Sequence, residues 1–249
     1  MWPALGMVVV AACGRIGFDG AAVDATDGAT PPDASGDASG DASGLRPLHE
    51  YPLQTDYNDL YGGPPLTSHG GNFVGNRYRF DTNQGLSVVG AMPRSVYTLD
   101  MTFSFDDHDG WRKLVDYDAL GPDTGLYTYK HALQFVIVPG ADFLTSEARF
   151  TDSVPSRLTI TRDASGNVTG YIDGVLSFGE LGGALPPATQ PTTPFTFEDT
   201  TSLAALSSNI VYFFVDDNAT SMTEAAPGTV ERIRIYDVAL TAQQVAAMQ

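Results

Sequence analysis

Residues 99–105 read Leu-Asp-Met-Thr-Phe-Ser-Phe, with apolar side chains at every second position. Leu99, Met101, Phe103 and Phe105 therefore fall on one face of an extended chain, and the polar residues between them fall on the other. This alternation predicts a β-strand with one face in a hydrophobic core and one face in water. It is the clearest strand signal in the chain.

Other apolar runs predict further strands. Residues 133–138 (Leu-Gln-Phe-Val-Ile-Val) and 210–215 (Ile-Val-Tyr-Phe-Phe-Val) are almost wholly apolar and rich in β-branched or aromatic side chains, so we expect both in the middle of a sheet. Residues 157–162 and 168–172 also read as strands. The connector between them, Asp-Ala-Ser-Gly-Asn at 163–167, consists of turn formers and predicts a hairpin.

The C-terminal half ends in a meander and a helix. A second turn, Asp173-Gly174, leads to a third strand at 175–178, whereas helical periodicity is confined to the last residues. There Thr241 and Gln244 form the Thr-x-x-Gln pattern of a capping box, which predicts a short helix over residues 242–248 that packs against the sheets. Short strands separated by turns over about 200 residues predict an all-β, two-sheet antiparallel sandwich or jelly roll.

The N-terminus carries a targeting signal. The only cysteine, Cys13, ends an apolar run, and Val10-Ala11-Ala12-Cys13 resembles the lipobox of a bacterial lipoprotein. The resemblance implies a signal peptide over residues 1–12, a lipid anchor on Cys13 and a location in the bacterial cell envelope, on the outer membrane or the cell surface. The alternative is an ordinary apolar start with a stray cysteine, which the absence of Lys and Arg from residues 1–12 favours.

Residues 13–44 are rich in Gly, Ala, Asp and Ser and nearly free of large apolar side chains, so they cannot build a core. The tetrapeptide Asp-Ala-Ser-Gly occurs three times in succession over residues 33–44. We expect a flexible linker between the lipid anchor and a single folded domain over residues 45–249.

The domain is strongly acidic. Six of the 30 acidic residues and one of the 13 basic residues precede Leu45, which leaves the domain 24 acidic and 12 basic side chains and a net charge of −12. Such a surface repels phosphate backbones and anionic head groups, so we expect no nucleic-acid partner and contact with a membrane through the lipid anchor only.

Residues 228–241 carry a family likeness. The string Gly-Thr-Val-Glu-Arg-Ile-Arg-Ile-Tyr-Asp-Val-Ala-Leu-Thr resembles the last strand and exit of laminin-G-like, concanavalin A-like jelly-roll domains. Residues 157–174 resemble a hairpin of the same family, and residues 123–127 and 78–80 are weaker matches. The resemblance implies two apposed sheets of about a dozen strands, and a family whose members bind glycans, bind proteins, cleave polysaccharides or only scaffold.

Two hydrolase patterns are missing from residues 45–249. Jelly-roll glucanases carry Glu-x-Asp-x-x-Glu on one strand, where alternation puts three carboxylates on one face, and α/β-hydrolases carry a Gly-x-Ser-x-Gly turn. Because neither occurs here, we expect a surface-anchored binding or adhesion module for a glycan or a protein, and not an enzyme. The alternatives are a polysaccharide-active hydrolase with an atypical site and a purely structural envelope protein.

Asp216 and Asp217 follow directly on the apolar run that ends at Val215, so they are expected at the rim of a sheet. Hard cations favour clustered carboxylates, and the resemblance implies that such rims hold calcium. The sequence predicts a structural Ca²⁺ bound by Asp216 and Asp217, and the alternative is a solvated acidic turn. The acid-rich stretch 106–110 lacks the spacing of a calcium loop and is interpreted as a hairpin turn.

Glu231 has the same strand parity as Ile233 and Ile235, so it should point into the core if they do. A buried carboxylate needs a partner, and the resemblance implies a structural cation at this position. A neighbouring arginine would satisfy the carboxylate equally well, and fraying of the strand end could leave it in water.

Three aromatic residues are candidates for glycan binding, which usually requires exposed rings with polar neighbours. Trp111 lies beside Asp109 and Arg112, and Tyr127 and Tyr129 share one face of an expected strand. The alternative is that these rings belong to the core.

Overall fold

The computed structural model describes residues 45–138, 142–182, 197–198 and 206–248. All of them belong to one compact unit that spans residues 39–249. The predicted signal peptide, Cys13 and the predicted linker over 13–44 lie outside the described residues, so they stay predictions. Within the described residues, no helix has the length and apolar character needed to cross a bilayer.

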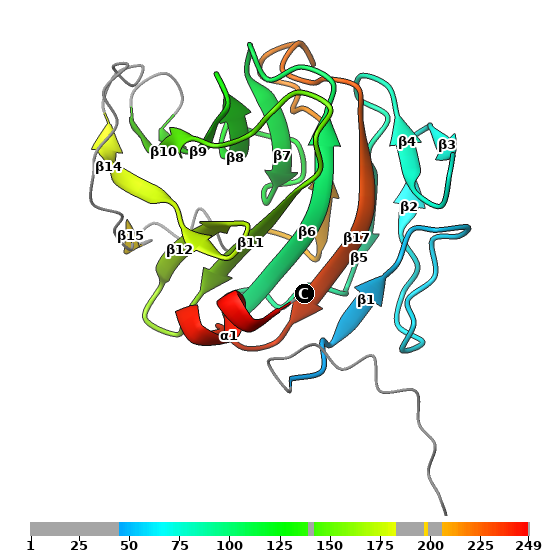
Figure 1. The fold of residues 1–249 in the computed structure, drawn as a ribbon, viewed down its shortest axis with the longest axis horizontal. Helices are drawn as coiled ribbons and strands as arrows, with labels where there is room; N and C mark the ends of the chain where they lie inside the picture. Colours follow the sequence, from blue (N-terminus) through cyan, green and yellow to red (C-terminus); the bar gives the residue numbers. More distant parts are fainter. Residues whose placement is uncertain (1–44, 139–141, 183–196, 199–205, 249) are drawn as a thin grey trace, which may run out of the picture. The chain divides into compact units, whose positions relative to one another are not determined.

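In the described part of the chain, nine strands form the first of two sheets. They are β1 (His49–Tyr51), β3 (Asn72–Phe73), β4 (Tyr78–Phe80), β6 (Tyr97–Phe105), β11 (Ser156–Arg162), β12 (Asn167–Ile172), β13 (Val175–Leu176), β15 (Phe197–Glu198) and β17 (Gly228–Tyr236). Among the described residues the order is β13-β12-β11-β6-β17-β4-β3, with β1 beside β17 and β15 beside β12. The long strands β6 and β17 therefore lie side by side in the middle of this sheet (Figure 1).

Eight strands of the described residues form the second sheet. They are β2 (Thr67–Ser68), β5 (Leu86–Val89), β7 (Arg112–Asp116), β8 (Gly125–Tyr129), β9 (Ala132–Val138), β10 (Asp142–Ala148), β14 (Phe178–Gly182) and β16 (Ile210–Phe213). In the part of the chain that the structure describes, the order is β14-β10-β9-β8-β7-β16-β5-β2 and neighbouring strands are antiparallel. The antiparallel two-sheet sandwich predicted from the sequence is confirmed, as are the central positions of β9 and β16.

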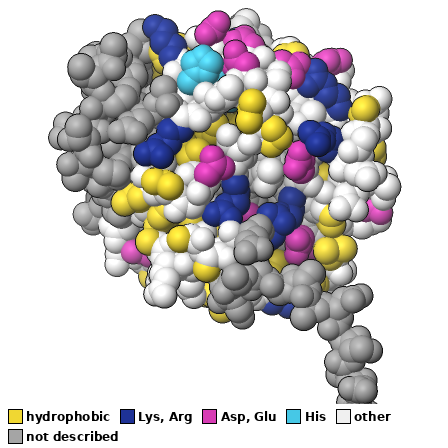
Figure 2. Space-filling view, in the orientation of Figure 1, with side chains coloured by type: hydrophobic (Ala, Val, Ile, Leu, Met, Phe, Trp, Pro, Cys, Tyr) yellow, Lys and Arg dark blue, Asp and Glu magenta, His cyan; other side chains and the backbone are white. Residues whose placement is uncertain are grey.

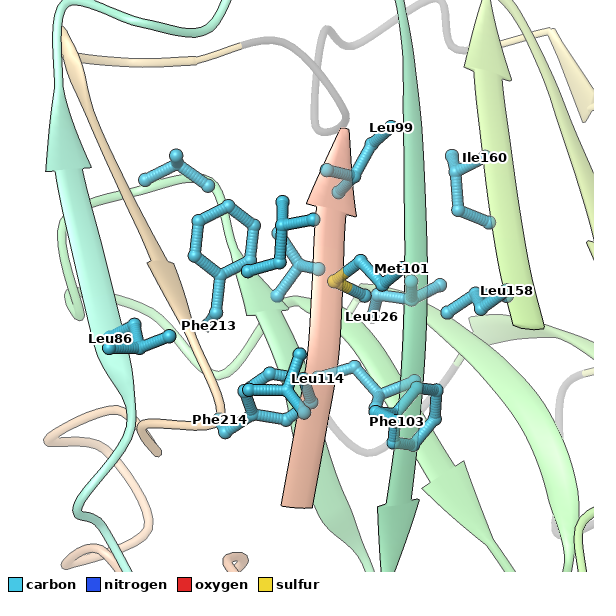
Figure 3. Packing of buried hydrophobic residues seen from close by; sticks show 14 of the residues in the cluster. Leu86, Leu99, Met101, Phe103, Leu114, Leu126, Leu158, Ile160, Phe213 and Phe214 are labelled. Carbon is cyan, nitrogen blue, oxygen red and sulfur yellow. The ribbon is translucent and has the colours of Figure 1, made fainter. Parts of the chain in front are cut away.

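The hydrophobic core lies between the two sheets. The alternating apolar side chains of β6, which start at Leu99 and end at Phe105, are all buried in it. Figure 3 shows side chains of β6 and β11 close to Leu114, Leu126 and Phe213 of the second sheet. Burying one such side chain is worth about 1.5–3 kcal/mol, so this layer supplies most of the driving force that holds the sheets together.

The C-terminal helix is as predicted. Helix α1 spans Ala242–Ala247, and its capping box is complete: the Thr241 side chain accepts a hydrogen bond from the Gln244 backbone N–H, and the Gln244 side chain accepts one from the Thr241 N–H. Val245 and Met248 are buried against Tyr236 of β17. The helix therefore packs on the outer face of the first sheet, on the side away from the core.

The outer face of β6 differs from its prediction, which placed it in water. Thr98 and Asp100 are fully buried. The Thr98 hydroxyl donates to the carbonyl of Val238 at 2.8 Å and accepts from the N–H of Leu240 at 2.9 Å. The chain that leaves β17 thus folds back over this face, and alternation along one strand cannot reveal such a cover.

The predicted hairpin and meander are confirmed. Strands β11 and β12 pair antiparallel, and β13 pairs with β12. In the connector, the Asp163 carboxylate accepts hydrogen bonds from the N–H groups of Ser165 at 2.8 Å and Asn167 at 2.9 Å. This is the usual way in which an aspartate closes a turn.

Residues 106–110 do not form a hairpin turn, and that prediction is wrong. They connect β6 in the first sheet to β7 in the second. His108 anchors the crossing: its ring is buried, stacks on Phe150 with centroids 5.2 Å apart, and lies 3.0 Å from the Thr128 hydroxyl. Burial lowers the pKa of His108 to about 4. The residue is therefore a neutral packing element at the end of the sandwich.

Candidate functional site

A fully buried lysine organises the outer side of the second sheet. The Lys113 ammonium donates hydrogen bonds to the carbonyl of Thr124 at 2.6 Å, to the Tyr127 hydroxyl at 2.6 Å and to Asp217 Oδ2 at 2.8 Å. A second carboxylate oxygen, Asp116 Oδ2, lies 3.3 Å away. All three protons of the ammonium are used, so its charge is compensated although its side chain is 0% exposed.

Asp116 and Asp217 also shape the loops that cover the lysine. Asp116 Oδ1 accepts hydrogen bonds from the N–H groups of Asp118 at 3.0 Å and Leu120 at 2.8 Å, which folds the loop between β7 and β8. Asp217 Oδ1 accepts from the N–H groups of Ala219 at 2.9 Å and residue 220 at 3.3 Å. Each carboxylate therefore binds the lysine with one oxygen and fixes its own loop with the other.

Tyr127 is another buried partner of Lys113. Its hydroxyl lies 2.8 Å from Asp123 Oδ1 and 3.0 Å from Asp217 Oδ2, and the Lys113 nitrogen lies 4.4 Å from its ring centroid. Burial raises the pKa of Tyr127 far above its ordinary value, and the carboxylates of Asp217 and Asp123 raise it further. The phenol is therefore neutral at physiological pH, and it holds the 118–124 loop against β8.

Asp216 is a buried carboxylate in the segment that follows β16, next to Asp217. Strand β16 ends at Phe213, and Phe214 has a φ of 61°, a conformation that breaks the strand. Asp216 Oδ2 then accepts hydrogen bonds from the Thr220 hydroxyl at 2.9 Å and the Glu224 N–H at 2.7 Å. Asp216 is fully buried, and its other oxygen, Oδ1, has no hydrogen-bond partner among the described residues.

Glu224 is the least compensated acid of the cluster. Its backbone is fixed, because its carbonyl accepts from the Lys113 N–H at 2.8 Å, but no described residue donates a hydrogen bond to its half-buried carboxyl group. Burial raises the pKa of Glu224 to about 7, and Asp123, Asp216 and Asp217 contribute to the rise while Lys113 opposes it. Near neutral pH this group can both give and take a proton.

A pair of aromatic rings borders the cluster. Trp111 and Tyr129, both half-buried, stack with centroids 4.6 Å apart and planes 23° apart. Trp111 also meets the buried Tyr127 edge-on, at 5.7 Å and 88°, and the Lys130 nitrogen lies 5.1 Å from the Tyr129 centroid. Tyr127 thus joins the aromatic pair to the buried charges, and together they form one site on the outer side of β7 and β8.

The structure brings together five of the six residues predicted to bind a metal ion or a glycan. Trp111, Tyr127, Tyr129, Asp216 and Asp217 lie in or beside this cluster. The residues that connect them were not predicted from the sequence; they are Lys113, Asp116, Asp123 and Glu224. A lysine inside a strand carries no local mark of burial, because its partner Asp217 lies 104 positions away in the chain.

Glu231 lies elsewhere, and its predicted inward direction is wrong. Its side chain is 33% exposed and pairs with Arg77 at 3.1 Å. The pairing of β17 with β6 shifts by one residue between Val230 and Arg232, which is a β-bulge. The extra residue breaks the alternation that the parity argument assumed.

The described residues contain no group of three or more His, Cys, Asp or Glu side chains that could hold a metal ion. In the cluster, Asp217 is engaged by Lys113 and by its own loop, whereas Asp216 retains one oxygen without a hydrogen-bond partner. The calcium site therefore stays a prediction.

Comparison with known proteins identifies the fold. No protein-family model matches the chain, and no curated protein matches its sequence. Trypanosoma rangeli sialidase in complex with the inhibitor DANA is similar in structure, with a TM-score of 0.57 and 15% identity over 80% of this chain and 32% of that chain. The same sialidase in complex with sialic acid has a TM-score of 0.57 and a sequence identity of 16%. The botulinum neurotoxin serotype D binding domain has a TM-score of 0.49 and a sequence identity of 10%, over 83% of this chain and 51% of that chain.

The likeness to the sialidase corrects one prediction. The domain was expected not to be an enzyme because two hydrolase patterns are missing, but the similar chains are sialidases, which are enzymes. The two missing patterns mark particular families of hydrolases, so their absence does not exclude enzymatic activity. The chain spans about a third of the length of the sialidase chain, so the likeness establishes a β-sandwich fold and does not by itself assign an activity.

Removing the lysine charge tests the cluster. We expect Lys113→Met to destabilise the domain by about 3–5 kcal/mol, because it leaves Asp116 and Asp217 as buried carboxylates without their cation. The control Lys130→Met removes an exposed ammonium and should cost less than about 1 kcal/mol. Urea unfolding followed by tryptophan fluorescence measures both, and equal midpoints for the two variants would contradict the assigned role.

The raised pKa of Glu224 predicts how the stability of the domain changes with pH. The folded chain holds this proton more tightly than the unfolded chain, whose group has the ordinary value of 4.5. Its contribution to stability is therefore complete below about pH 4.5 and is lost as the pH rises through about 7. The loss amounts to a few kcal/mol at most.

Glu224→Gln, a neutral isostere, should match the wild type near pH 4 and exceed it in stability near pH 8. Unfolding free energies across this range measure the difference, and Asp237→Asn, which changes an exposed carboxylate, serves as the control. A Glu224→Gln difference that does not vary with pH would rule out the proton uptake.

Proposed function

We propose that this domain binds glycans at the aromatic pair of Trp111 and Tyr129 and the adjoining carboxyl group of Glu224. The observation that carries the proposal is the junction of two kinds of surface. A stacked, half-buried indole and phenol adjoin Tyr127, whose hydroxyl contacts Lys113 and Asp217. These two charged groups also lie near the Glu224 carboxyl group, to which no described residue donates a hydrogen bond. At the level of fold, the likeness to a sialidase solved with sialic acid supports a glycan-related role.

The chemistry of the site suits a sugar. The C–H face of a pyranose ring can pack on the indole of Trp111, as apolar ligand surfaces pack on aromatic rings. Hydroxyl groups at the ring edge can then bond to Glu224, which accepts or donates according to its protonation. The buried Lys113 network sets the position of both parts, because it fixes β7, β8 and the loop that carries Glu224.

A second candidate function is glycoside hydrolysis. It is favoured by the pKa of Glu224, which is raised to about 7 by burial and by the neighbouring carboxylates. A general acid needs such a value to carry a proton at neutral pH. A hydrolase also needs a second carboxylate within roughly 5–10 Å, and Asp123 and Asp216 are near enough to raise the pKa of Glu224.

A glycan array separates the candidates. The full chain should bind a subset of glycans, and Trp111→Ala should weaken that binding about tenfold or more, as loss of an aromatic anchor does. The control Phe73→Ala removes another half-buried ring, one packed between Tyr57 and Tyr78 away from the site. A Trp111→Ala variant that binds every glycan with the affinity and stoichiometry of the wild type would exclude this site.

Two additions to the same experiment decide the remaining questions. Binding in chelator and in millimolar calcium tests the proposed Ca²⁺ at Asp216 and Asp217, and equal binding and equal melting midpoints would remove calcium from the proposal. Release of reducing sugar from bound glycans, abolished by Glu224→Gln, would establish the hydrolase.

We also propose that the chain is anchored in a bacterial envelope by acylation of Cys13, on the basis of the lipobox-like sequence. In a bacterium with lipoprotein processing, the protein should partition into detergent and lose residues 1–12. Cys13→Ser should release it into the aqueous phase, since one thiol carries the attachment. Mass spectrometry of the wild type that shows an unmodified Met1 would contradict the anchor.

A further inference from the structure

The first sheet carries a groove on its outer face, on the opposite side of the sandwich from Trp111. It has a volume of about 650 Å³. Its polar lining consists of Glu50, Gln54, Asn76, Thr102, Glu231 and Arg232. These residues come from β1, the segment after it, the turn before β4 and the paired strands β6 and β17. Figure 2 shows Lys and Arg side chains intermingled with Asp and Glu on this face of the molecule.

The β-bulge in β17 creates the polar wall of this groove. Val230 pairs with Phe103 and Arg232 pairs with Thr102, so Glu231 is an extra residue on one strand. Val230 and Ile233 both point into the core. The two residues between them therefore both lie on the outer side, and a carboxylate and a guanidinium line the groove together. Bulges often redirect side chains in this way next to binding sites.

The carboxylates of the groove are held in place by arginines. Glu231 pairs with Arg77 at 3.1 Å, and Glu50 Oε1 lies 3.5 Å from Arg234 Nε. The Tyr61 hydroxyl donates to the other oxygen of Glu50 at 3.3 Å. These contacts fix the acceptors before a ligand arrives, which lowers the entropic cost of binding.

The mixture of charges decides the class of ligand. An anionic ligand would meet Glu50 and Glu231, whereas a cationic ligand would meet Arg232. A hydroxyl group, in contrast, donates to a carboxylate and accepts from a guanidinium at the same time. The amides of Gln54 and Asn76 can bond to either side of such a group.

The groove also has an apolar border. Leu60 is 60% exposed, which is a large exposure for a leucine, and it lines the groove together with Pro52. A ligand with many hydroxyl groups and an apolar C–H face matches this combination. Neutral sugars have both features.

We propose that this groove is a second glycan site, which binds an uncharged saccharide through Glu231, Arg232 and Thr102 and acts independently of Trp111. The proposal shares its ligand class with the proposed function, and to that extent rests on it. Two sites on opposite faces of one sandwich would let a single domain bind two chains of a polysaccharide, and the gain in avidity would depend on whether one glycan can reach both.

The test uses the full chain and an array that carries neutral glucose, xylose and N-acetylglucosamine oligomers beside carboxylate-bearing uronic acid oligomers. We expect neutral oligomers to bind, and Arg232→Ala, made in the Trp111→Ala background so that the first site does not contribute, to weaken that binding about tenfold or more, since a hydrogen bond to a charged group is lost. Asn76→Gly is a second variant that keeps the fold, because Asn76 has a φ of 60° that glycine adopts readily.

The control is Arg79→Ala, and it and Asn76→Gly are made in the same background. Arg79 lies on β4 and pairs with Asp106, outside the groove. Binding lost in Arg232→Ala and Asn76→Gly but kept in Arg79→Ala supports the groove. Binding already lost in Trp111→Ala, or kept in both groove variants, overturns the groove alone, and binding kept at wild-type affinity and stoichiometry in Trp111→Ala but lost in the groove variants overturns the first site alone. Binding of uronic acid oligomers alone, or of none, overturns the proposal of a neutral-sugar groove.

Discussion

An ammonium group that is 0% exposed must find compensation inside the protein, and much of this molecule's outer architecture follows from that requirement. The Lys113 nitrogen takes partners from the 118–124 loop, from β8 and from the loop after β16. The free energy for placing it there comes from the apolar layer between the sheets, which holds the strands in register whatever lies outside. The charge cluster therefore positions the residues around it and adds little net stability. It fixes where Trp111, Tyr129 and Glu224 lie relative to one another.

Local patterns predicted what local physics determines. The alternation of Leu99 to Phe105, the hairpin over 157–172 and the capping box at Thr241 each depend on neighbours within a few residues, and the structure confirms them. The failures depend on partners far along the chain. The covered outer face of Asp100, the crossing at 106–110 and the buried state of Lys113 arise from segments that the sequence does not bring near one another.

The sequence predicted the aromatic residues of the candidate site and two of its acidic residues, Asp216 and Asp217, but not the lysine or the other acids. Trp111, Tyr127 and Asp217 stand out because such residue types are chemically conspicuous, whereas Glu224 becomes notable only through burial and three neighbouring carboxylates. The absence of a hydrolase motif was a weaker argument still. A sequence motif marks one family of enzymes on one fold. The likeness to a sialidase shows that a similar β-sandwich also occurs in an enzyme other than the glucanases that carry the Glu-x-Asp-x-x-Glu motif.

The bulge at Glu231 allows this residue to be deleted without a change in the register of β17 and β6. Because Val230 and Arg232 pair with the adjacent residues Phe103 and Thr102, deleting Glu231 would join two correctly registered halves of β17 and leave the core side chains on their original faces. A single-codon deletion here would therefore change the surface of the sheet and spare its interior. One deletion can therefore remove a lining residue of the groove, and one insertion can restore it, without an intermediate sequence that fails to fold.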